Sequence, residues 1–279
     1  SSSGACATAE PMPFNQEDID RGSVGFLLCN PDHGCARVVA VRAGSVPPCH
    51  ACSASVFKWT DLAGKEKLKS ELDKIKSLTQ RGSLGVPEVL SEGTNSFSSW
   101  FEMDHYAKTD VVSTGDPRVI TLLRSWISDE CISPLENKLG ALLWATEKWT
   151  PSQGELERLA ALKIRKAVVH GDFAPWNLRT RLGRLTAIDW EWAEPDGLAG
   201  IDLCYGLLQE ALLVKKLPPR QALHFVRDAA ESPGCKEYLK ATGWHNAIDL
   251  WIKTGILYRH TRKFCLELLD ALCGIERIK

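Results

Sequence analysis

The residue types that could do chemistry are concentrated in two short segments, residues 170–179 (HGDFAPWNLR) and residues 188–191 (IDWE). Asp172 can accept the proton of an attacking hydroxyl group. Asn177 and Asp189 carry oxygen atoms of the kind that Mg²⁺ prefers beside nucleotide phosphates. The two segments therefore predict phosphoryl transfer, with Asp172 as the base and with Asn177 and Asp189 as metal ligands.

The elements around these side chains must bring them together. The apolar residues 167–169 predict a short buried strand that leads into Asp172. Residues 181–184 (RLGR) predict a turn between two short strands. A hairpin at this place would return Asp189 to the side of Asn177, so that both predicted metal ligands converge.

This pattern resembles the catalytic and metal-binding loops of the aminoglycoside phosphotransferase and choline kinase superfamily, which are small-molecule relatives of the protein kinases. In that family His-Gly-Asp, four further residues and Asn are followed about a dozen residues later by Ile-Asp-Trp or Ile-Asp-Phe-Glu, as in this chain. The resemblance covers residues from about 21 to 260. It implies an α+β, two-lobed protein-kinase-like fold, with a small N-terminal antiparallel sheet plus one helix and a larger, mostly helical C-terminal lobe.

The resemblance also implies a co-substrate, ATP or GTP, together with Mg²⁺, and a small hydroxyl-bearing acceptor. In the family, a strand lysine faces the α- and β-phosphates and is paired with a helix glutamate. Lys58 interrupts the apolar run 54–59, and a lysine there is costly unless it meets an anion or points to solvent from an edge strand. Glu71 falls within the apolar stripe of a predicted helix over 64–79, so Glu71 is the predicted partner of Lys58, with Glu66 as the rival.

The segment between the lobes of such kinases binds the adenine edge through its backbone. The resemblance places Glu102, Met103 and Asp104 in that segment, with His105 after them. The glycine-rich loop of kinases has no clear match, because residues 30–35 (NPDHGC) contain one glycine. The phosphate clamp is therefore left unassigned.

Three other side chains in or near the motif are candidates for supporting the catalytic loop or the metal. His170 is expected to brace the catalytic loop through ring hydrogen bonds. Asp202 is placed to cap a predicted helix, and the matching aspartate of the family also braces the His-Gly-Asp backbone. Glu191 either assists a second metal ion or is an ordinary loop carboxylate.

The chain has 279 residues, which is enough for two domains. Residues 1–20 are expected to form a loose lead-in, 21–104 the nucleotide-binding N-lobe, and 105–279 the helical C-lobe with the catalytic loop, the metal loop and the acceptor site. Strands are predicted at 25–28, 36–41, 53–59, 88–90 and 98–103. Helices are predicted in the C-lobe at 117–130, 134–149, 152–163, 199–214, 219–231, 235–242 and 245–274.

Composition and charge exclude several classes of partner. The net charge is −1, so nothing indicates binding to nucleic acid or to an acidic membrane surface. No apolar run approaches a membrane span, and residues 1–13 lack the features of a signal peptide. The ten cysteines have scattered spacings, which indicates a reducing compartment and hence the cytoplasm. The sequence does not indicate an oligomeric state.

One group of four cysteines and a histidine contains the residue types of a zinc site. The loop 29–35 and the loop 44–52 would lie at opposite ends of one predicted strand, separated by roughly 20 Å at about 3.3 Å per residue. That separation disfavours a common zinc ion for Cys29, His33, Cys35, Cys49 and Cys52.

The acceptor itself is not identified by the motif. Residues 200–279 contain twelve Lys or Arg and nine Asp or Glu, a net charge of +3, and Arg259 and Arg262 lie one helical turn apart. This balance favours a neutral or anionic hydroxyl compound over a polycationic aminoglycoside. The alternative is a pocket lined by acids such as Asp104, Asp110 and Asp116. Three aromatic residues together with Arg259 fit a sugar, a nucleoside or an anionic metabolite, although aromatic residues on helices more often belong to the core. They are Trp244, Trp251 and Tyr258.

Three other functions are compatible with a kinase-like sequence and compete with the small-molecule kinase. A nucleotide-binding pseudokinase or scaffold would not need all of Asp172, Asn177 and Asp189. A protein kinase is disfavoured because no Ala-Pro-Glu element follows the metal loop. An aminoglycoside-type antibiotic kinase is the alternative that differs only in its acceptor.

Overall fold

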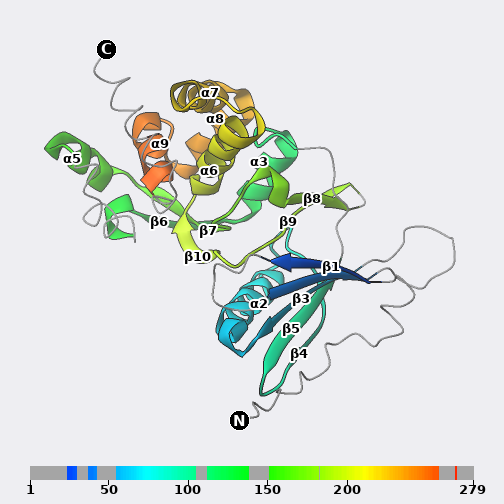
Figure 1. Cartoon of the computed structure of the whole chain (residues 1–279). Coiled ribbons are helices and arrows are strands. Elements are labelled where there is room, and N and C mark those ends of the chain that lie inside the picture. The colour runs from blue at the N-terminus through cyan, green and yellow to red at the C-terminus, as the bar shows by residue number, and fades with distance from the viewer. Residues whose placement is uncertain are drawn as a thin grey trace, which may run out of the picture. The chain divides into compact units, whose positions relative to one another are not determined.

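A computed structural model describes residues 24–29, 37–42, 55–104, 112–137, 151–181, 183–257 and 268, with backbone alone for 24–29, 37–42 and 181 (Figure 1). The chain divides into two compact units. The first contains Ser1–Ser77 and Pro87–Tyr106, and the second contains Leu78–Val86 and Ala107–Lys279. Leu78–Val86, which the sequence placed in the N-lobe, therefore groups with the second unit.

The first unit is an antiparallel five-stranded sheet with one long helix, α2, beside it in Figure 1. The strand order is β1-β2-β3-β5-β4, so β3 lies inside the sheet and β4 lies at its edge. All five predicted strands and the predicted helix are present, with small shifts of their ends. Their bounds are β1 Val24–Cys29, β2 Arg37–Arg42, β3 Ser55–Asp61, α2 Lys65–Gln80, β4 Val89–Thr94 and β5 Ser98–Asp104.

Helix α2 follows directly from β3. Asp61 ends the strand and accepts a hydrogen bond from the backbone N–H of Gly64 at 3.2 Å, across the short 3₁₀ turn Leu62–Gly64. The helix then buries one stripe, formed by Leu68, Ile75 and Leu78. These residues recur at helical spacing, so burial of one face explains the helix as the sequence predicted.

The second unit contains a three-stranded sheet of order β10-β7-β6, a β8–β9 hairpin and most of the helices. Helices thus predominate in this unit and the sheets are antiparallel, which confirms the α+β class. The strands are β6 Ile127–Ile132, β7 Ile164–Val169, β8 Leu178–Arg181, β9 Arg184–Ala187 and β10 Glu194–Leu198. The helices are α3 Pro117–Ser125, α5 Gln153–Ala161, α6 Ile201–Gln209, α7 Pro219–Glu231, α8 Pro233–Thr242 and α9 Ile248–Leu257.

Two elements of this unit differ from the prediction. The helix predicted over 117–130 ends at Ser125, and the following residues form β6 because they pair with β7. Strand β10 was not predicted, because its sequence EPDGL contains three poor strand formers. It exists through pairing with β7 across a register shift. In both places tertiary pairing overrides local propensity.

Three other predicted helices are present in a different form or fall partly outside the described residues. The predicted helix 199–214 is present as α6 followed by a π-helical turn, Glu210–Val214. The predicted helix 134–149 begins with a 3₁₀ turn at Pro134–Glu136, and residues 138–150 lie outside the described part of the chain. The same holds for residues 258–267 and 269–274 of the last predicted helix.

Helix α6 is the centre of the second unit, and each of its nine residues is buried. Neighbouring segments approach α6 so closely that glycine is needed at two contacts. A Cβ atom at Gly206 of α6 would lie 2.7 Å from the backbone oxygen of Phe173. A Cβ atom at Gly255 of α9 would lie 2.4 Å from Sγ of Cys204 on α6. Since the chain on both sides leaves no free space, α6 is held firmly against the segment that follows β7.

Trp244 and Trp251 also hold the start of α6. Both side chains are fully buried, and their indole N–H groups donate to the backbone oxygens of Ala199 and Gly200 at 2.8 and 2.9 Å. They are therefore core residues and do not line an acceptor site. Within the described residues, no helix has the length and apolar character that crossing a bilayer requires.

Candidate active site

Strand β7 delivers the predicted catalytic loop. Its last residues are buried, and Gly171 follows with a φ angle of +83°, in the left-handed region that favours glycine. A Cβ atom at Gly171 would lie 2.3 Å from the backbone oxygen of Trp192. The glycine between His170 and Asp172 is therefore required by backbone geometry and by close contact with the chain after the metal loop.

The backbone of this loop is held by Asp202, in the first turn of α6. Its two carboxylate oxygens accept hydrogen bonds from the backbone N–H groups of His170 and Gly171, at 2.6 and 3.0 Å. The bracing role predicted for Asp202 is thus confirmed. The capping role was wrong, because Gly200 is the N-cap residue and makes no side-chain cap.

His170 braces the loop from the other side. Its Nδ1 accepts a hydrogen bond from the backbone N–H of Asp172 at 3.2 Å, and its Nε2 lies 2.9 Å from the backbone oxygen of Ile188. Because a carbonyl oxygen only accepts, this arrangement requires the neutral tautomer with the proton on Nε2. The ring is fully buried, with its centroid 4.6 Å from that of Trp190. The predicted bracing of the catalytic loop through ring hydrogen bonds is confirmed, and His170 in addition joins this loop to the metal loop.

The carboxylate of Asp172 is held at both oxygens. Oδ1 accepts a hydrogen bond from the hydroxyl of Tyr205 at 2.6 Å, and Oδ2 accepts one from Nδ2 of Asn177 at 3.1 Å. Tyr205 was missed in the sequence. It follows Asp202 by three residues on one helix, and residues so spaced share a face. That spacing is the feature that could have revealed it.

Asn177 has a defined amide orientation. Its Nδ2 also donates to the backbone oxygen of Asp172, at 2.9 Å. Two acceptors therefore contact the same atom of the amide, which assigns it as nitrogen. The amide oxygen Oδ1 consequently points away from Asp172 and is the atom suited to bind a cation. The residue itself is buried, at the end of the 3₁₀ turn Pro175–Asn177.

The hairpin predicted between the metal ligands is present. Strands β8 and β9 pair in register, and the backbone N–H of Ile188 donates to the backbone oxygen of Asn177 at 2.9 Å. Asp189 follows with a φ angle of +70°, which is uncommon for a residue other than glycine and is better tolerated by Asp and Asn. The structure thus brings Asp189 to the strand end beside Asn177, in a strained conformation typical of functional sites.

These residues fit Mg²⁺ rather than a fully protein-enclosed metal. Mg²⁺ is commonly held by one or two carboxylate or amide oxygens, with substrate phosphates and waters completing its shell. Asn177 and Asp189 supply such a pair. Across the described ranges, no group of three or more His, Cys, Asp or Glu side chains could hold a metal ion. The zinc candidates His33, Cys35, Cys49 and Cys52 and the side chain of Cys29 lie outside those ranges.

The first unit contains the predicted lysine–glutamate pair. Nζ of Lys58 lies 2.6 Å from Oε1 of Glu71, and the two side chains are 11% and 0% exposed. The rival Glu66 is exposed and is excluded. The edge-strand alternative is also wrong, because Lys58 pairs with Val39 on β2 and with Phe101 on β5. Contact of Lys58 with phosphates stays a prediction.

The residues predicted to bind adenine end strand β5. Glu102 and Met103 have strand neighbours on both sides, and Glu102 accepts hydrogen bonds from the hydroxyls of Ser55 and Ser91, at 2.5 and 2.7 Å. The backbone N–H of Asp104 donates to the backbone oxygen of Glu88 at 3.1 Å. Their role in adenine binding stays a prediction, and His105 lies outside the described residues.

No protein-family model matches the sequence, and no curated protein sequence matches it. Among solved structures, a fructosamine-3-kinase candidate from Haemophilus somnus 129PT matches with a TM-score of 0.50 and 11% identity, over 89% of this chain and 90% of that one. The chain has a protein-kinase-like fold. The resemblance inferred from the sequence motifs is confirmed at this level.

Two further solved structures have TM-scores of 0.47. An aminoglycoside-3'-phosphotransferase of type VIII is 17% identical, over 92% of this chain and 98% of that one. An aminoglycoside phosphotransferase from Streptomyces rimosus ATCC10970, in complex with ADP and streptomycin, is 14% identical, over 92% of this chain and 95% of that one.

Proposed function

We propose that the protein is a phosphotransferase that moves the γ-phosphate of ATP or GTP to a hydroxyl group of a small molecule, with Mg²⁺ as the cofactor. The observation that carries this proposal is the pair formed by Asp172 and Asn177. One hydrogen bond of 3.1 Å orients the carboxylate as a base, and the same amide directs its oxygen away from that carboxylate, where it could bind a cation. A carboxylate base and a metal ligand fixed by each other suit in-line phosphoryl transfer.

In this proposal each side chain has one task. Asp172 accepts a hydrogen bond from the acceptor hydroxyl, orients it for attack and takes its proton as the new P–O bond forms. The bond between the γ-phosphorus and the β–γ bridging oxygen breaks in the same transfer, and the nucleoside diphosphate leaves. Lys58, oriented by Glu71, places positive charge on the α- and β-phosphates. Asn177 and Asp189 would hold Mg²⁺, which when bound neutralises charge that develops on the phosphate oxygens. The rate enhancement then comes from positioning and electrostatics.

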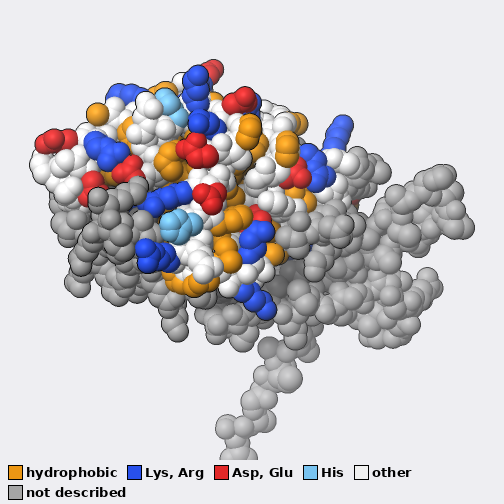
Figure 2. Space-filling model, turned by 90° about the horizontal axis from the view of Figure 1, so that it is seen from above, with side chains coloured by type: hydrophobic (Ala, Val, Ile, Leu, Met, Phe, Trp, Pro, Cys, Tyr) orange, Lys and Arg blue, Asp and Glu red, His pale blue; other side chains and the backbone are white. Residues whose placement is uncertain are grey.

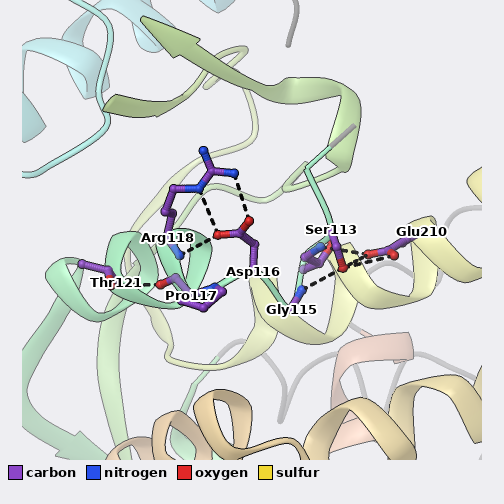
Figure 3. Close-up of polar contacts among 8 residues, drawn as sticks. Ser113, Gly115, Asp116, Pro117, Arg118, Thr121 and Glu210 are labelled. Carbon is purple, nitrogen blue, oxygen red and sulfur yellow. Dashed lines mark hydrogen bonds and ion pairs between the residues drawn. The ribbon is translucent and has the colours of Figure 1, made fainter. Parts of the chain in front are cut away.

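For the acceptor we propose a neutral or anionic hydroxyl compound. Near the start of α3, two acids are already engaged by the protein itself (Figure 3). Asp116 forms a two-point ion pair with Arg118, and hydrogen bonding from that guanidinium lowers the pKa of the Asp116 carboxyl. Glu210 is buried and accepts hydrogen bonds from the hydroxyl of Ser113 and the backbone N–H of Thr114. Acids so engaged offer little to a polycation.

Other residues that bear on the charge of the acceptor lie outside the described part of the chain. Arg259 and Arg262, which favoured an anionic group in the sequence, lie there, as does Asp110. On the face shown in Figure 2, basic and acidic side chains are interspersed and neither forms a continuous patch. This mixture supports a small-molecule acceptor rather than an extended charged partner.

A thermal-shift panel followed by product analysis tests this function. ATP and GTP, each with Mg²⁺, are expected to raise the melting temperature, because a ligand that binds the folded state stabilises it. Sugars, nucleosides, amino alcohols and kanamycin-like amines are then incubated with the stabilising nucleotide, and phosphorylated products are sought by mass spectrometry. If neither nucleotide at millimolar concentration shifts the melting temperature, the kinase function is contradicted. Nucleotide binding without transfer to any acceptor would favour the pseudokinase.

A further inference from the structure

The hydroxyl of Tyr205 donates a short hydrogen bond to the candidate base, and nothing in the sequence motif requires it. Its oxygen lies 2.6 Å from Oδ1 of Asp172. Tyr205 is buried, with 3% of its surface exposed, so water competes little for this hydrogen bond. A hydrogen bond to an ionised group in such surroundings is stronger than one between neutral groups.

Tyr205 lies on the face of helix α6 that contacts the catalytic loop. Asp202 lies three residues earlier on the same helix face and accepts two backbone N–H groups of the catalytic loop. One turn of helix therefore holds the backbone of the loop through Asp202 and the side chain of its base through Tyr205. Because Gly206, the next residue, packs against the backbone oxygen of Phe173, this turn cannot shift without disturbing the loop.

The two oxygens of Asp172 consequently have different donors. Oδ2 is bound by the amide of Asn177, the predicted metal ligand, whereas Oδ1 is bound by a phenol that belongs to the core of the second unit. Without the phenol, Oδ1 would lose this hydrogen bond, and the orientation of the carboxylate about its χ2 bond would be held less firmly. A change in that orientation would misplace the base relative to the acceptor hydroxyl, and small misplacements of a reacting group lower rates strongly.

We propose that Tyr205 is a positioning residue for the transfer reaction, which fixes the orientation of the Asp172 carboxylate through its hydroxyl. This inference rests on the proposed function and adds a residue to it. Tyr205 acts on the acceptor through Asp172 and does not itself contact the nucleotide. Its removal should therefore affect the rate of transfer and leave nucleotide binding unchanged.

Tyr205→Phe tests this role, because it removes one oxygen atom and keeps the ring. We expect kcat for the best acceptor of the panel to fall about 10-fold or more, as for the loss of a hydrogen bond to a charged group. The KM for the nucleotide and the melting-temperature shift caused by Mg²⁺-nucleotide should stay within two-fold of wild type, roughly. Rates are compared per folded protein, at a temperature below both melting transitions.

Tyr238→Phe is the matched control. Tyr238 is equally buried, and its hydroxyl accepts a hydrogen bond from the backbone N–H of Gly200 at 3.2 Å, at the N-terminus of α6, without contact with the base. This variant should lose stability but keep its kcat. Equal losses of kcat in the two variants would overturn the role, because general loosening of α6 would then explain them.

The remaining outcomes are also decisive. An active wild type with a fully active Tyr205→Phe variant removes the positioning role and leaves the proposed function intact. A Tyr205→Phe chain that cannot fold removes it as well, since the hydroxyl would then serve folding. A wild type without any transfer removes both the proposed function and the role that rests on it.

Discussion

The backbone oxygen of Trp192 occupies the place where a side chain at Gly171 would begin, since an ideal Cβ atom there would lie 2.3 Å from it. This contact joins the chain after the metal loop to the residue that precedes Asp172. The glycine of the His-Gly-Asp motif therefore has a packing reason in this protein, in addition to its left-handed backbone.

Gly171→Ala is expected to be strongly destabilising and to abolish activity. The left-handed φ angle costs about 1–2 kcal/mol for a residue with a Cβ atom, and the overlap with Trp192 adds about 1–3 kcal/mol. Gly183→Ala is the control, because Gly183 has a similar φ of +77° but nothing within 4 Å of its Cβ position. Denaturant unfolding of both variants measures the difference, and equal losses would show that the contact with Trp192 does not matter.

Asp189→Asn is expected to weaken binding of Mg²⁺-nucleotide and to preserve the fold. Asn tolerates the left-handed conformation as well as Asp does, so the substitution removes charge without adding backbone strain. Loss even of an outer partner of a metal ligand typically costs 10–100-fold in affinity, so a loss of roughly 10-fold or more is expected here. A Mg²⁺ titration of nucleotide binding checks this, and unchanged metal dependence would argue against Asp189 as a ligand.

Lys58→Ala is expected to destabilise the protein by about 3–5 kcal/mol, because it leaves the fully buried carboxylate of Glu71 without its cation. The combined change Lys58→Met with Glu71→Leu should recover most of this loss, since it removes both buried charges. Both proteins should show a reduced melting-temperature shift with Mg²⁺-nucleotide.

Lys76→Ala is the control for that pair. Lys76, also on α2, forms an ion pair with Glu92 in which both side chains are more than 40% exposed, and exposed pairs contribute about 0–1 kcal/mol. The melting-temperature shift that Mg²⁺-nucleotide causes in Lys76→Ala should equal that of wild type. A Lys58→Ala protein that is as stable as Lys76→Ala would contradict the buried charge pair.

Much of this arrangement could be predicted because it depends on local patterns. The hairpin that returns Asp189 to Asn177 follows from a turn between two short strands, and the pairing of Lys58 with Glu71 follows from an inward carboxylate on an amphipathic helix. Strands β6 and β10 could not be predicted, because their residues form strands only by pairing with β7. Tyr205 was missed for a similar reason, since its partner lies 33 residues earlier in the chain.

The most direct measurement is the formation of phosphorylated acceptor by wild type and Asp172→Ala, alongside their nucleotide affinities. Asp172 is proposed to contact the acceptor hydroxyl rather than the triphosphate. Wild type should therefore produce the phosphoester and nucleoside diphosphate in equal amounts, whereas Asp172→Ala should produce neither and bind Mg²⁺-nucleotide with an affinity within a few-fold of wild type. Phosphoester formation by Asp172→Ala at the wild-type rate would contradict the assignment of Asp172 as the base.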